Sequence, residues 1–374
     1  MIYRSFQDLK LSALGMGGMR LPMLPEDNKT VDEAAVAELV DCAMAHGINY
    51  YDTAWGYHGG QSEVALGKAL RRHPRDSYCI ADKFPGYDLR NMDKVESIFE
   101  EQLRRTGMEY FDFYLFHNVN ELNINHYLDD ETYGIYSYLI KQKQNGRIRH
   151  LGFSAHGEMP VLERFLNAYG KDMEFCQLQI NWVDWEFQKA QEKVELMRKW
   201  NLPVWVMEPL RGGKLVSLAP ERTAELAKLR PEETMPGWCF RFLQSLEDVV
   251  VTLSGMTTLE QLKENIRAYE ECKPLNETEL NSILELGREL TRGVPCTACS
   301  YCTTHCPQGL DIPSLMELYN EQTFGGNGFL IPMRMKVLGE GKRPADCLGC
   351  RSCEAVCPQN IKISEVLSDF ARKL

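Results

Sequence analysis

Short apolar segments alternate with amphipathic segments over roughly the first 270 residues of the chain. The amphipathic segment 31–47 carries apolar residues three or four positions apart and ends at Gly47, a pattern typical of a helix. The apolar segments are nearly continuous, as in strands of a parallel sheet that helices cover on both faces. These predicted strands are 11–18, 48–54, 78–84, 111–118, 148–155, 175–181, 203–210 and 249–255.

Eight strand–helix units in about 270 residues fit the size of a closed (β/α)₈ barrel. An open doubly wound sheet is the alternative. Its GxGxxG turn is absent, because GMGGM at 15–19 has a different glycine spacing. The sequence therefore predicts an α/β protein whose larger part is a TIM barrel.

The composition changes near residue 275. The segment 276–290 predicts a further helix, with Asn276 as the N-cap and Glu279 three residues later. Eight of the thirteen cysteines then fall between Cys296 and Cys357. We therefore expect a barrel domain over 1–275, a connecting helix over 276–292 and a small cysteine-rich domain over 293–374.

The cysteine-rich segment contains an internal repeat. CTACSYCTTHCPQGLDIPSLM (296–316) aligns without gaps on CLGCRSCEAVCPQNIKISEVL (347–367), and each half has the spacing C-x₂-C-x₂-C-x₃-C-P. Zinc sites usually pair cysteines as two C-x₂-C units with a long loop between them, and disulfides do not persist in a reducing compartment. Both halves thus favour iron–sulfur ligands over zinc or disulfides.

This spacing resembles the two-cluster bacterial ferredoxins, and the helix-like stretches of the long spacer resemble their mainly helical variety. In that family the fourth cysteine of each run binds the other cluster. The resemblance implies two [4Fe–4S] clusters. One would be held by Cys296, Cys299, Cys302 and Cys357, and the other by Cys347, Cys350, Cys353 and Cys306.

Four polar residues lie at or after the ends of consecutive predicted strands: Asp52, Tyr57, Lys83 and His117. The C-terminal ends of barrel strands meet at one rim, where barrel enzymes place their active sites. We expect Asp52 to pair with Lys83, and Lys83 to lower the pKa of Tyr57. Tyr57 would then protonate a carbonyl oxygen, with His117 donating to the substrate oxygen or orienting the proton transfer.

The segment DTAWGY with the following Ser62, Glu63 and Gly67, together with GRIRHLGFS (146–154) and QLKENI (261–266), resembles the aldo-keto reductase family over about residues 1–290. The resemblance implies a nicotinamide cofactor across the barrel mouth. Ser154, Gln177 and Asn181 would face the nicotinamide. The loop residues Glu208, Pro209, Leu210, Gly212, Gly213 and Lys214 would follow the pyrophosphate, and Gly255, Gln261, Glu264 and Asn265 would hold the adenosine end.

The cofactor's identity stays open at this point. NADP-specific members of the family carry cationic and hydroxyl side chains around the 2′-phosphate, where this chain has Gly255, Met256 and Gln261. NADP and NAD are both candidates. Nicotinamide moves two electrons as hydride whereas a cluster moves one, so a flavin that joins the two is a further candidate.

The net charge and the lack of long apolar segments limit the kinds of partner that this chain can have. A net charge of −11 argues against nucleic acid or an anionic membrane as the main partner. The start of the chain lacks the apolar core of a signal peptide, and no segment approaches the roughly 20 apolar residues of a spanning helix, so we expect a cytoplasmic protein. The expected partners are a small carbonyl or alcohol substrate and a one-electron carrier such as ferredoxin or flavodoxin.

Three functions are compatible with these features. The first is an oxidoreductase whose barrel exchanges hydride with a carbonyl or alcohol while the clusters exchange electrons with the carrier. The second is a nicotinamide-only carbonyl reductase with structural or redox-sensing clusters. The third is a non-enzymatic subunit that senses a cofactor or transfers electrons, which the complete Asp52, Tyr57, Lys83 and His117 set argues against.

Overall fold

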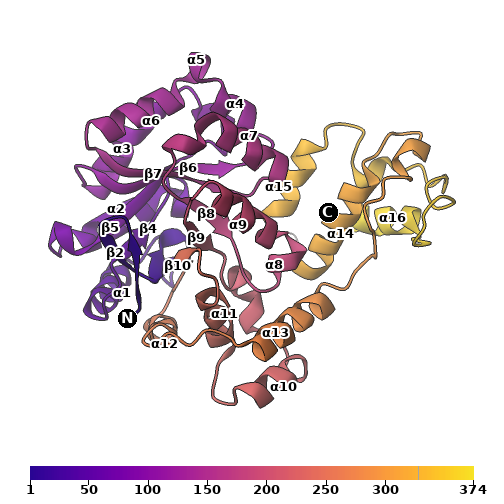
Figure 1. Ribbon diagram of the computed structural model, residues 1–374. Coiled ribbons are helices and arrows are strands. Elements are labelled where there is room, and N and C mark those ends of the chain that lie inside the picture. The colour runs from indigo at the N-terminus through magenta and orange to yellow at the C-terminus, as the bar shows by residue number, and fades with distance from the viewer. Residues whose placement is uncertain (327) are drawn as a thin grey trace. The chain divides into compact units, whose positions relative to one another are not determined.

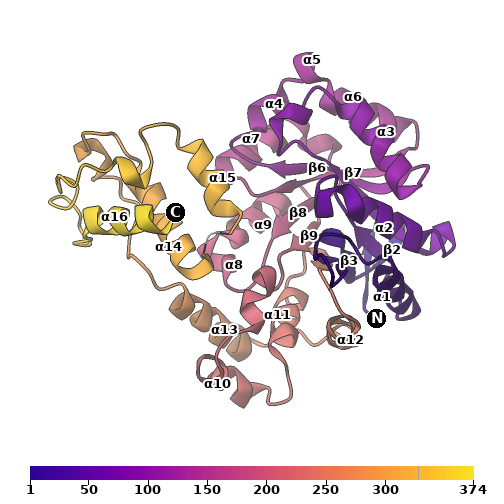
Figure 2. The same ribbon diagram turned by 180° about the vertical axis from the view of Figure 1, so that it is seen from behind.

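A computed structural model describes residues 1–326 and 328–374, and the chain divides into two compact units, Met1–Ile283 and Leu284–Leu374. Figure 1 and Figure 2 show it from opposite sides. In the first unit eight parallel strands close into a barrel in the order β10-β3-β4-β5-β6-β7-β8-β9. They are β3 (Leu14–Gly17), β4 (Tyr50–Asp52), β5 (Cys79–Phe84), β6 (Phe111–Val119), β7 (Ile148–Ala155), β8 (Cys176–Gln179), β9 (Val204–Met207) and β10 (Val249–Ser254). The predicted (β/α)₈ barrel is confirmed.

Helices surround the strands on the outside of the barrel (Figure 1). In α3, for example, Ile98, Phe99 and Leu103 face the sheet, and Gly107 ends the helix with a φ of 67°. The helices of the ring are α1 (Glu33–Ala45), α2 (Gln61–Leu70), α3 (Val95–Thr106), α6 (Ile135–Gln144), α7 (Met159–Tyr169), α9 (Ala190–Lys199), α11 (Met235–Gln244) and α12 (Leu259–Ala268). The loops carry the shorter α4 (Ile124–Leu128), α5 (Asp130–Tyr133) and α8 (Asp184–Phe187), and also α10 (Pro220–Leu229).

A two-stranded hairpin precedes the barrel. The predicted strand 11–18 is in fact divided: β2 (Leu9–Ser12) pairs antiparallel with β1 (Tyr3–Phe6), and only Leu14–Gly17 enters the barrel. Phe6 packs edge-on against Trp205, with ring centroids 5.0 Å apart, inside a buried cluster that includes Phe113 and Phe175. The hairpin thus adds an aromatic residue to the barrel core, at the end of the strands away from the predicted rim.

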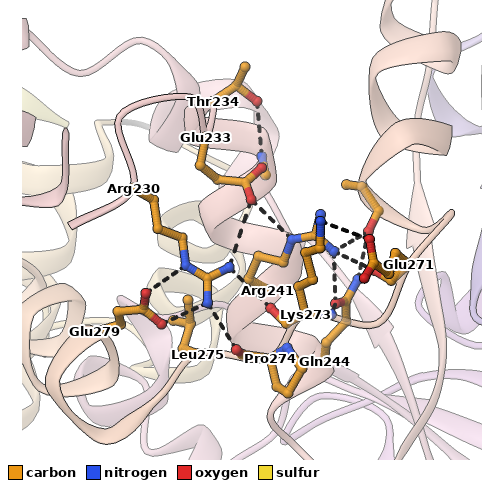
Figure 3. A network of polar contacts seen from close by, with 12 residues as sticks. Arg230, Glu233, Thr234, Arg241, Gln244, Glu271, Lys273, Pro274, Leu275 and Glu279 are labelled. Carbon is orange, nitrogen blue, oxygen red and sulfur yellow. Dashed lines mark hydrogen bonds and ion pairs between the residues drawn. The ribbon is translucent and has the colours of Figure 1, made fainter. Parts of the chain in front are cut away.

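The helix predicted over 276–290 is α13 (Glu277–Leu290). Its start has the expected capping box, in which Glu279 N–H donates to Asn276 Oδ1 and Asn276 N–H donates to the Glu279 carboxylate. Arg230, at the end of α10, donates twice to the same carboxylate, at 2.7 Å each (Figure 3). Arg241 on α11 donates to the backbone carbonyls of Ala268 and Glu271. These contacts attach the first turn of α13 to the barrel unit.

The second unit begins within α13 and continues with α14 (Ile312–Gly325), α15 (Leu330–Val337) and α16 (Ile363–Lys373), with loops that carry the cysteines. Its core is aliphatic apart from Phe370, and it includes Cys302 and Cys353. Within the described part of this unit there is no strand, which agrees with the predicted mainly helical form. Across residues 1–326 and 328–374, no helix combines the length and apolarity needed to cross a membrane.

Candidate active site and cluster-binding site

A buried ion pair lies at the rim formed by the C-terminal ends of β4 and β5. Asp52 ends β4 and Lys83 is the fifth residue of β5; their side chains are 4% and 1% exposed. Lys83 Nζ donates to Asp52 Oδ1 at 2.5 Å and to the carbonyl of Thr53 at 2.7 Å. Burial disfavours the charged amine, but Asp52 and Tyr57 outweigh it, so the pKa of Lys83 lies above its ordinary value. Lys83 therefore carries a fixed positive charge at this point of the rim.

Tyr57 and His117 lie beside this charge. Lys83 Nζ is 5.1 Å from the centre of the Tyr57 ring, and the Tyr57 and His117 ring centroids are 6.1 Å apart. Burial and the Lys83 charge hold the pKa of His117 well below its ordinary value, so this imidazole is neutral. Its Nδ1 is buried and has no hydrogen-bond partner. The structure thus brings all four predicted rim residues together.

The expected direction of the Tyr57 pKa shift is wrong. Burial raises the pKa of Tyr57 above its ordinary value and outweighs the lowering by Lys83. The sequence places a lysine beside the tyrosine but does not show how deeply both are buried. Tyr57 consequently keeps its phenolic proton at neutral pH.

Two buried carboxylates, Glu63 and Asp82, are joined through Gln102 to the backbone of Lys83. Gln102 Nε2 donates to Glu63 Oε1 at 3.1 Å, to Asp82 Oδ1 at 2.7 Å and to the carbonyl of Lys83 at 3.0 Å. Burial and the Glu63 charge raise the pKa of Asp82 well above its ordinary value. Asp82 Oδ2 is buried without a hydrogen-bond partner, so it is the oxygen that can carry a proton. One shared proton on this pair would leave a single negative charge, which Arg105, 2.8 Å from Glu63 Oε2, balances.

An aromatic residue that the sequence did not single out borders Tyr57 and His117. Tyr87 follows β5, and its ring lies edge-on to His117 with centroids 5.0 Å apart. Its hydroxyl also leaves no room for a Cβ on Gly56, since such an atom would lie 2.2 Å away. Tyr87 is 40% exposed, so one part faces the rim residues and another faces solvent. Its only signal in the sequence is its position just after a strand end.

The three residues expected at the nicotinamide differ in how they are engaged. Gln177 Oε1 is buried without a partner, which leaves an acceptor for a carboxamide N–H. Ser154 Oγ accepts the N–H of Asn118 at 2.8 Å. Asn181 is committed to the protein itself, because its amide group donates to Asp184 and to the Glu208 carbonyl. Gln177 therefore fits the expected group best, while Asn181 holds two loops together.

The loop expected along the pyrophosphate is built from left-handed turns. Glu208, Arg211, Gly212 and Gly213 all have positive φ values, between 48° and 91°. Pro209 is buried, Leu210 half-buried and Lys214 exposed. At the expected adenosine end, Gln261 Oε1 accepts the N–H of Thr257, buried Asn265 donates to Ser254 Oγ, and Glu264 is half-buried. The two segments belong to the neighbouring strands β9 and β10.

Arg20 lies between these two segments and was not predicted as a site residue. A Cβ on Gly255 would lie 3.0 Å from Arg20 Cβ and 3.1 Å from its Cγ, and one on Gly212 would lie 3.1 Å from Arg20 Nη2. The exposed Arg20 side chain thus runs across Gly255 toward Gly212. It comes from the loop after β3, far in sequence from both glycines. Closure of the barrel makes β3 and β10 neighbours, and this proximity is what the sequence motif GMGGMR does not reveal.

The cysteines of the second unit line two separate cavities. Four cysteines line the first: Cys296, Cys299, Cys302 and Cys357. Four line the second: Cys306, Cys347, Cys350 and Cys353. Each cavity thus combines three cysteines of one half with the fourth cysteine of the other.

The four cysteines of each cavity stand at the positions that the cluster ligands were expected to take. Within the described ranges, no three His, Cys, Asp or Glu side chains gather as a group that would hold one metal ion. A [4Fe–4S] cluster binds each thiolate through a different iron and so needs more widely spaced sulfurs than tetrahedral zinc. An N–H from Leu310 also points to Cys306 Sγ at 3.5 Å, the kind of bond that tunes a cluster's potential.

Comparison with known proteins assigns both units. The model of the aldo/keto reductase family matches residues 13–288. The chain belongs to this family. The model of the 4Fe-4S dicluster domain matches residues 295–361, so this aldo/keto reductase carries an iron–sulfur domain C-terminal to its barrel in the sequence. It is therefore an oxidoreductase.

Curated relatives match the aldo/keto reductase over most of their own length. A probable aldo-keto reductase 1 from Glycine max is 28% identical over 75% of this chain and 86% of its own. An NADH-specific methylglyoxal reductase from Escherichia coli is 26% identical over 70% and 90%. Among solved structures, the holo form of aldo-keto reductase AKR11C1 from Bacillus halodurans has a TM-score of 0.61 and 25% identity over 76% of this chain and 96% of its own.

Proposed function

We propose that the barrel reduces a small aldehyde or ketone, or oxidises the corresponding alcohol, with Tyr57 as the proton donor. The observation that carries this proposal is the buried Lys83–Asp52 pair directly beside the Tyr57 ring. Such a pair costs desolvation energy and is weak evidence for stability alone. It is well suited to stabilise negative charge that develops on an oxygen held by Tyr57.

The residues divide the work as follows. Tyr57 keeps its proton at neutral pH, which is the form needed to protonate a carbonyl oxygen. Lys83 then stabilises the phenolate as the proton leaves, and Asp52 holds Lys83 in position. Neutral His117 is able to donate from one ring nitrogen to the same oxygen, and Tyr87 would border the substrate.

A nicotinamide cofactor would supply or accept the hydride. The unpartnered Gln177 Oε1 supports its placement, and Ser154 lies on the adjacent strand. Arg20 would add a positive charge against the cofactor's phosphates, beside Gly212 and Gly255. Relatives differ in their nicotinamide: one is named NADH-specific, and a Klebsiella pneumoniae aldo/keto reductase was solved with NADP. Affinities of wild type and Arg20→Gln for both cofactors will assign the preference.

We further propose two [4Fe–4S] clusters that exchange electrons with a one-electron carrier. The two four-cysteine cavities support this number and the crossed ligand sets. Two clusters together hold two electrons, the number in one hydride. Whether a flavin joins the two kinds of transfer is decided by extraction of anaerobically purified protein, where resolved yellow bands identify it.

The test of the barrel chemistry is Tyr57→Phe. We expect the rate of carbonyl reduction to fall by about 10²–10⁴-fold, with little change in cofactor affinity, because only the proton donor is lost. Small aldehydes that include methylglyoxal serve as substrates. Tyr110→Phe is the matched control, since that ring stacks with Arg75 and Arg149, away from the rim. An undiminished rate in Tyr57→Phe would refute the assignment.

The pH profile gives a second test. Because the pKa of Tyr57 is raised above about 10 and that of His117 is lowered well below 6.5, neither group changes protonation between pH 6 and pH 9. We expect kcat/KM for reduction to stay flat over this range. A loss of rate between pH 7 and pH 9 would instead indicate a Tyr57 pKa that is lowered in the working enzyme.

The nicotinamide-only alternative makes a different prediction. If the clusters are structural, protein whose clusters have been oxidatively bleached keeps its rate of NAD(P)H-dependent carbonyl reduction, while its free energy of unfolding falls. If they exchange electrons, as we propose, NAD(P)H and a substrate alcohol change the cluster absorbance of intact protein, and electron delivery to a one-electron dye is lost with the clusters.

A further inference from the structure

The two cysteine runs fold into matching loops. With an offset of 51 residues, positive φ values recur at the same places: Ala298 and Gly349 at 54° and 66°, Ser300 and Arg351 at 62° and 60°. Gly309 and Asn360 repeat the correspondence at 58° and 54°. The same backbone therefore surrounds each cavity, and side-chain differences between matched positions need another explanation.

The mouths of the two cavities carry different side chains. Thr297 and Ser300 line the first cavity, and the matched residues Leu348 and Arg351 line the second. Leu348 is 65% exposed, and so is the Arg351 side chain. An exposed leucine and an exposed arginine have thus replaced two small hydroxyl residues on the same loop geometry.

A second cation, Lys342, lies beside a residue that lines the second cavity. Lys342 Nζ donates to the carbonyls of Gln308, at 2.6 Å, and Gly309, at 3.2 Å; Gln308 lines this cavity. No charged side chain is among the described residues that line the first cavity. We call Lys342, Leu348 and Arg351 the second-cavity rim.

Two acidic groups, Glu354 and Glu365, lie near the second-cavity rim, and only Glu354 is engaged within the unit. The Glu354 carboxylate accepts from the N–H and hydroxyl of Ser364 at the start of α16. Glu365 approaches Arg351 only to 3.7 Å, with both side chains well exposed, so it neutralises little of the Arg351 charge.

The net charge differs between the two units. Residues 284–374 contain ten basic and ten acidic residues, so the whole excess of eleven negative charges lies in residues 1–283. An acidic partner would be repelled by the barrel unit and not by this one.

We propose that the second-cavity rim is the docking surface for an acidic one-electron carrier protein, and that electrons enter or leave through the cluster of Cys306, Cys347, Cys350 and Cys353. This inference rests on the proposed cluster function. Leu348 offers the small apolar contact and the two cations offer the steering charge that transient electron-transfer complexes use. Cys350, an exposed cysteine on the loop of Leu348 and Arg351, would bring this cluster close to the surface beside the docking residues. One electron leaves the carrier and the cluster gains it, with no bond made or broken.

The test uses the intact, cluster-loaded chain and an acidic flavodoxin. The rim variant is Leu348→Thr/Arg351→Ser, which places on the second loop the residues that already occupy the same backbone conformation in the first. The matched control is Thr297→Ala/Ser300→Ala on the first loop. We measure the Kd for oxidised flavodoxin and, by stopped flow, the rate at which reduced flavodoxin bleaches the cluster absorbance. Reduced methyl viologen, a small cation that needs no docking surface, reports on cluster integrity.

We expect the rim variant to weaken binding and slow bleaching by about tenfold at low salt, and to match wild type at about 0.5 M salt, where surface charges are screened. The control variant and all viologen rates should stay at the wild-type level. Wild-type rates for the rim variant would overturn the docking surface while leaving carrier exchange intact. Another outcome is that the rim variant slows cluster reduction by NAD(P)H and leaves cluster reduction by flavodoxin unchanged. The second-cavity rim would then serve electron transfer from the barrel and not from a carrier, which also overturns the proposal. No flavodoxin exchange in the wild type would overturn both this surface and the carrier part of the proposed function.

Discussion

The barrel rim and the cysteine loops organise their reactive groups in opposite ways. At the barrel rim, Asp52 and Tyr57 come from the end of β4 and the loop that follows it, whereas Lys83 comes from β5. The protein already pairs Lys83 with Asp52 and Thr53. In the second unit the reactive groups come from two short runs, and Cys302 and Cys353 are themselves part of the hydrophobic core. The barrel therefore positions its chemistry by its own packing, whereas the cysteine loops would need their clusters to complete the packing.

The two cores explain this difference. The barrel interior contains a cluster of large rings, among them Phe6, Phe113, Phe175 and Trp205, with centroid distances as short as 4.7 Å. The second unit has a small core of mostly aliphatic residues, and its loops hold Ala298, Ser300 and Arg351 in left-handed conformations that cost energy. Bonds from thiolates to a cluster would offset that cost, as metal binding does in other small domains.

The largest predicted effect follows from this contrast. Cys302→Ser or Cys353→Ser should remove one cluster ligand and abolish the cooperative unfolding of the second unit, while the barrel keeps its own transition. Metal centres of small domains contribute on the order of 10 kcal/mol, more than the whole stability of many domains. Calorimetry would show one transition in place of two, and limited proteolysis would cut within residues 284–374.

Cys272→Ser is the control for that experiment, because Cys272 is an exposed cysteine of the barrel unit and should leave both transitions in place. A second unit that still unfolds cooperatively after cluster loss would mean that its small core suffices, and the contrast between the two units would then fail.

The same contrast governs what the sequence could reveal. The grouping of the cysteines around two cavities could be predicted because the cysteine runs are local: spacing within a run carries the information. The strand ends were predicted because nearly continuous apolar segments mark buried parallel strands. The β1–β2 hairpin was missed because its turn is Gln7–Asp8, with Gln7 at a φ of 51°, and lacks the usual asparagine or glycine signal.

Features that depend on three-dimensional proximity were not predicted. Arg20 becomes a site candidate only when barrel closure brings it beside Gly255. The direction of the Tyr57 pKa shift depends on burial, which outweighs the neighbouring lysine. Asn181 appeared free for a ligand, yet it holds the loops after β8 and β9 together.

A second prediction tests whether packing within the barrel unit alone holds Asp52 and Lys83 in place at the barrel rim. Lys83→Met leaves Asp52 buried without its partner, so the free energy of barrel unfolding should fall by about 3–5 kcal/mol. Denaturant unfolding followed by tryptophan fluorescence measures this change. The cluster absorbance and the transition of the second unit should be unaffected.

The double variant Asp52→Asn/Lys83→Met provides the control, since it removes the isolated charge and should recover much of the lost stability without recovering activity. If Lys83→Met is as stable as wild type, water or protonation of Asp52 relieves the unpaired carboxylate, and the rim is less rigid than the packing indicates.

The smallest predicted effect concerns the turn that leads from one unit to the other. Arg230→Gln removes the two hydrogen bonds to Glu279 at the start of α13 and leaves the carbonyls of Lys273 and Pro274 without this donor (Figure 3). We expect the free energy of barrel unfolding to fall by about 1.5–3 kcal/mol, the range for hydrogen bonds to charged groups. Arg230 lowers the pKa of Glu279, so its contribution is present above the unfolded-state value of about 4.3 and is lost as the pH falls through the lower folded value. The difference in unfolding free energy between variant and wild type should therefore shrink below about pH 4.

Arg288→Gln is the matched control, because that arginine pairs with Glu285 on the exposed side of the same helix. A difference that persists unchanged at pH 3 would mean that the backbone carbonyls, and not the carboxylate, account for the role of Arg230.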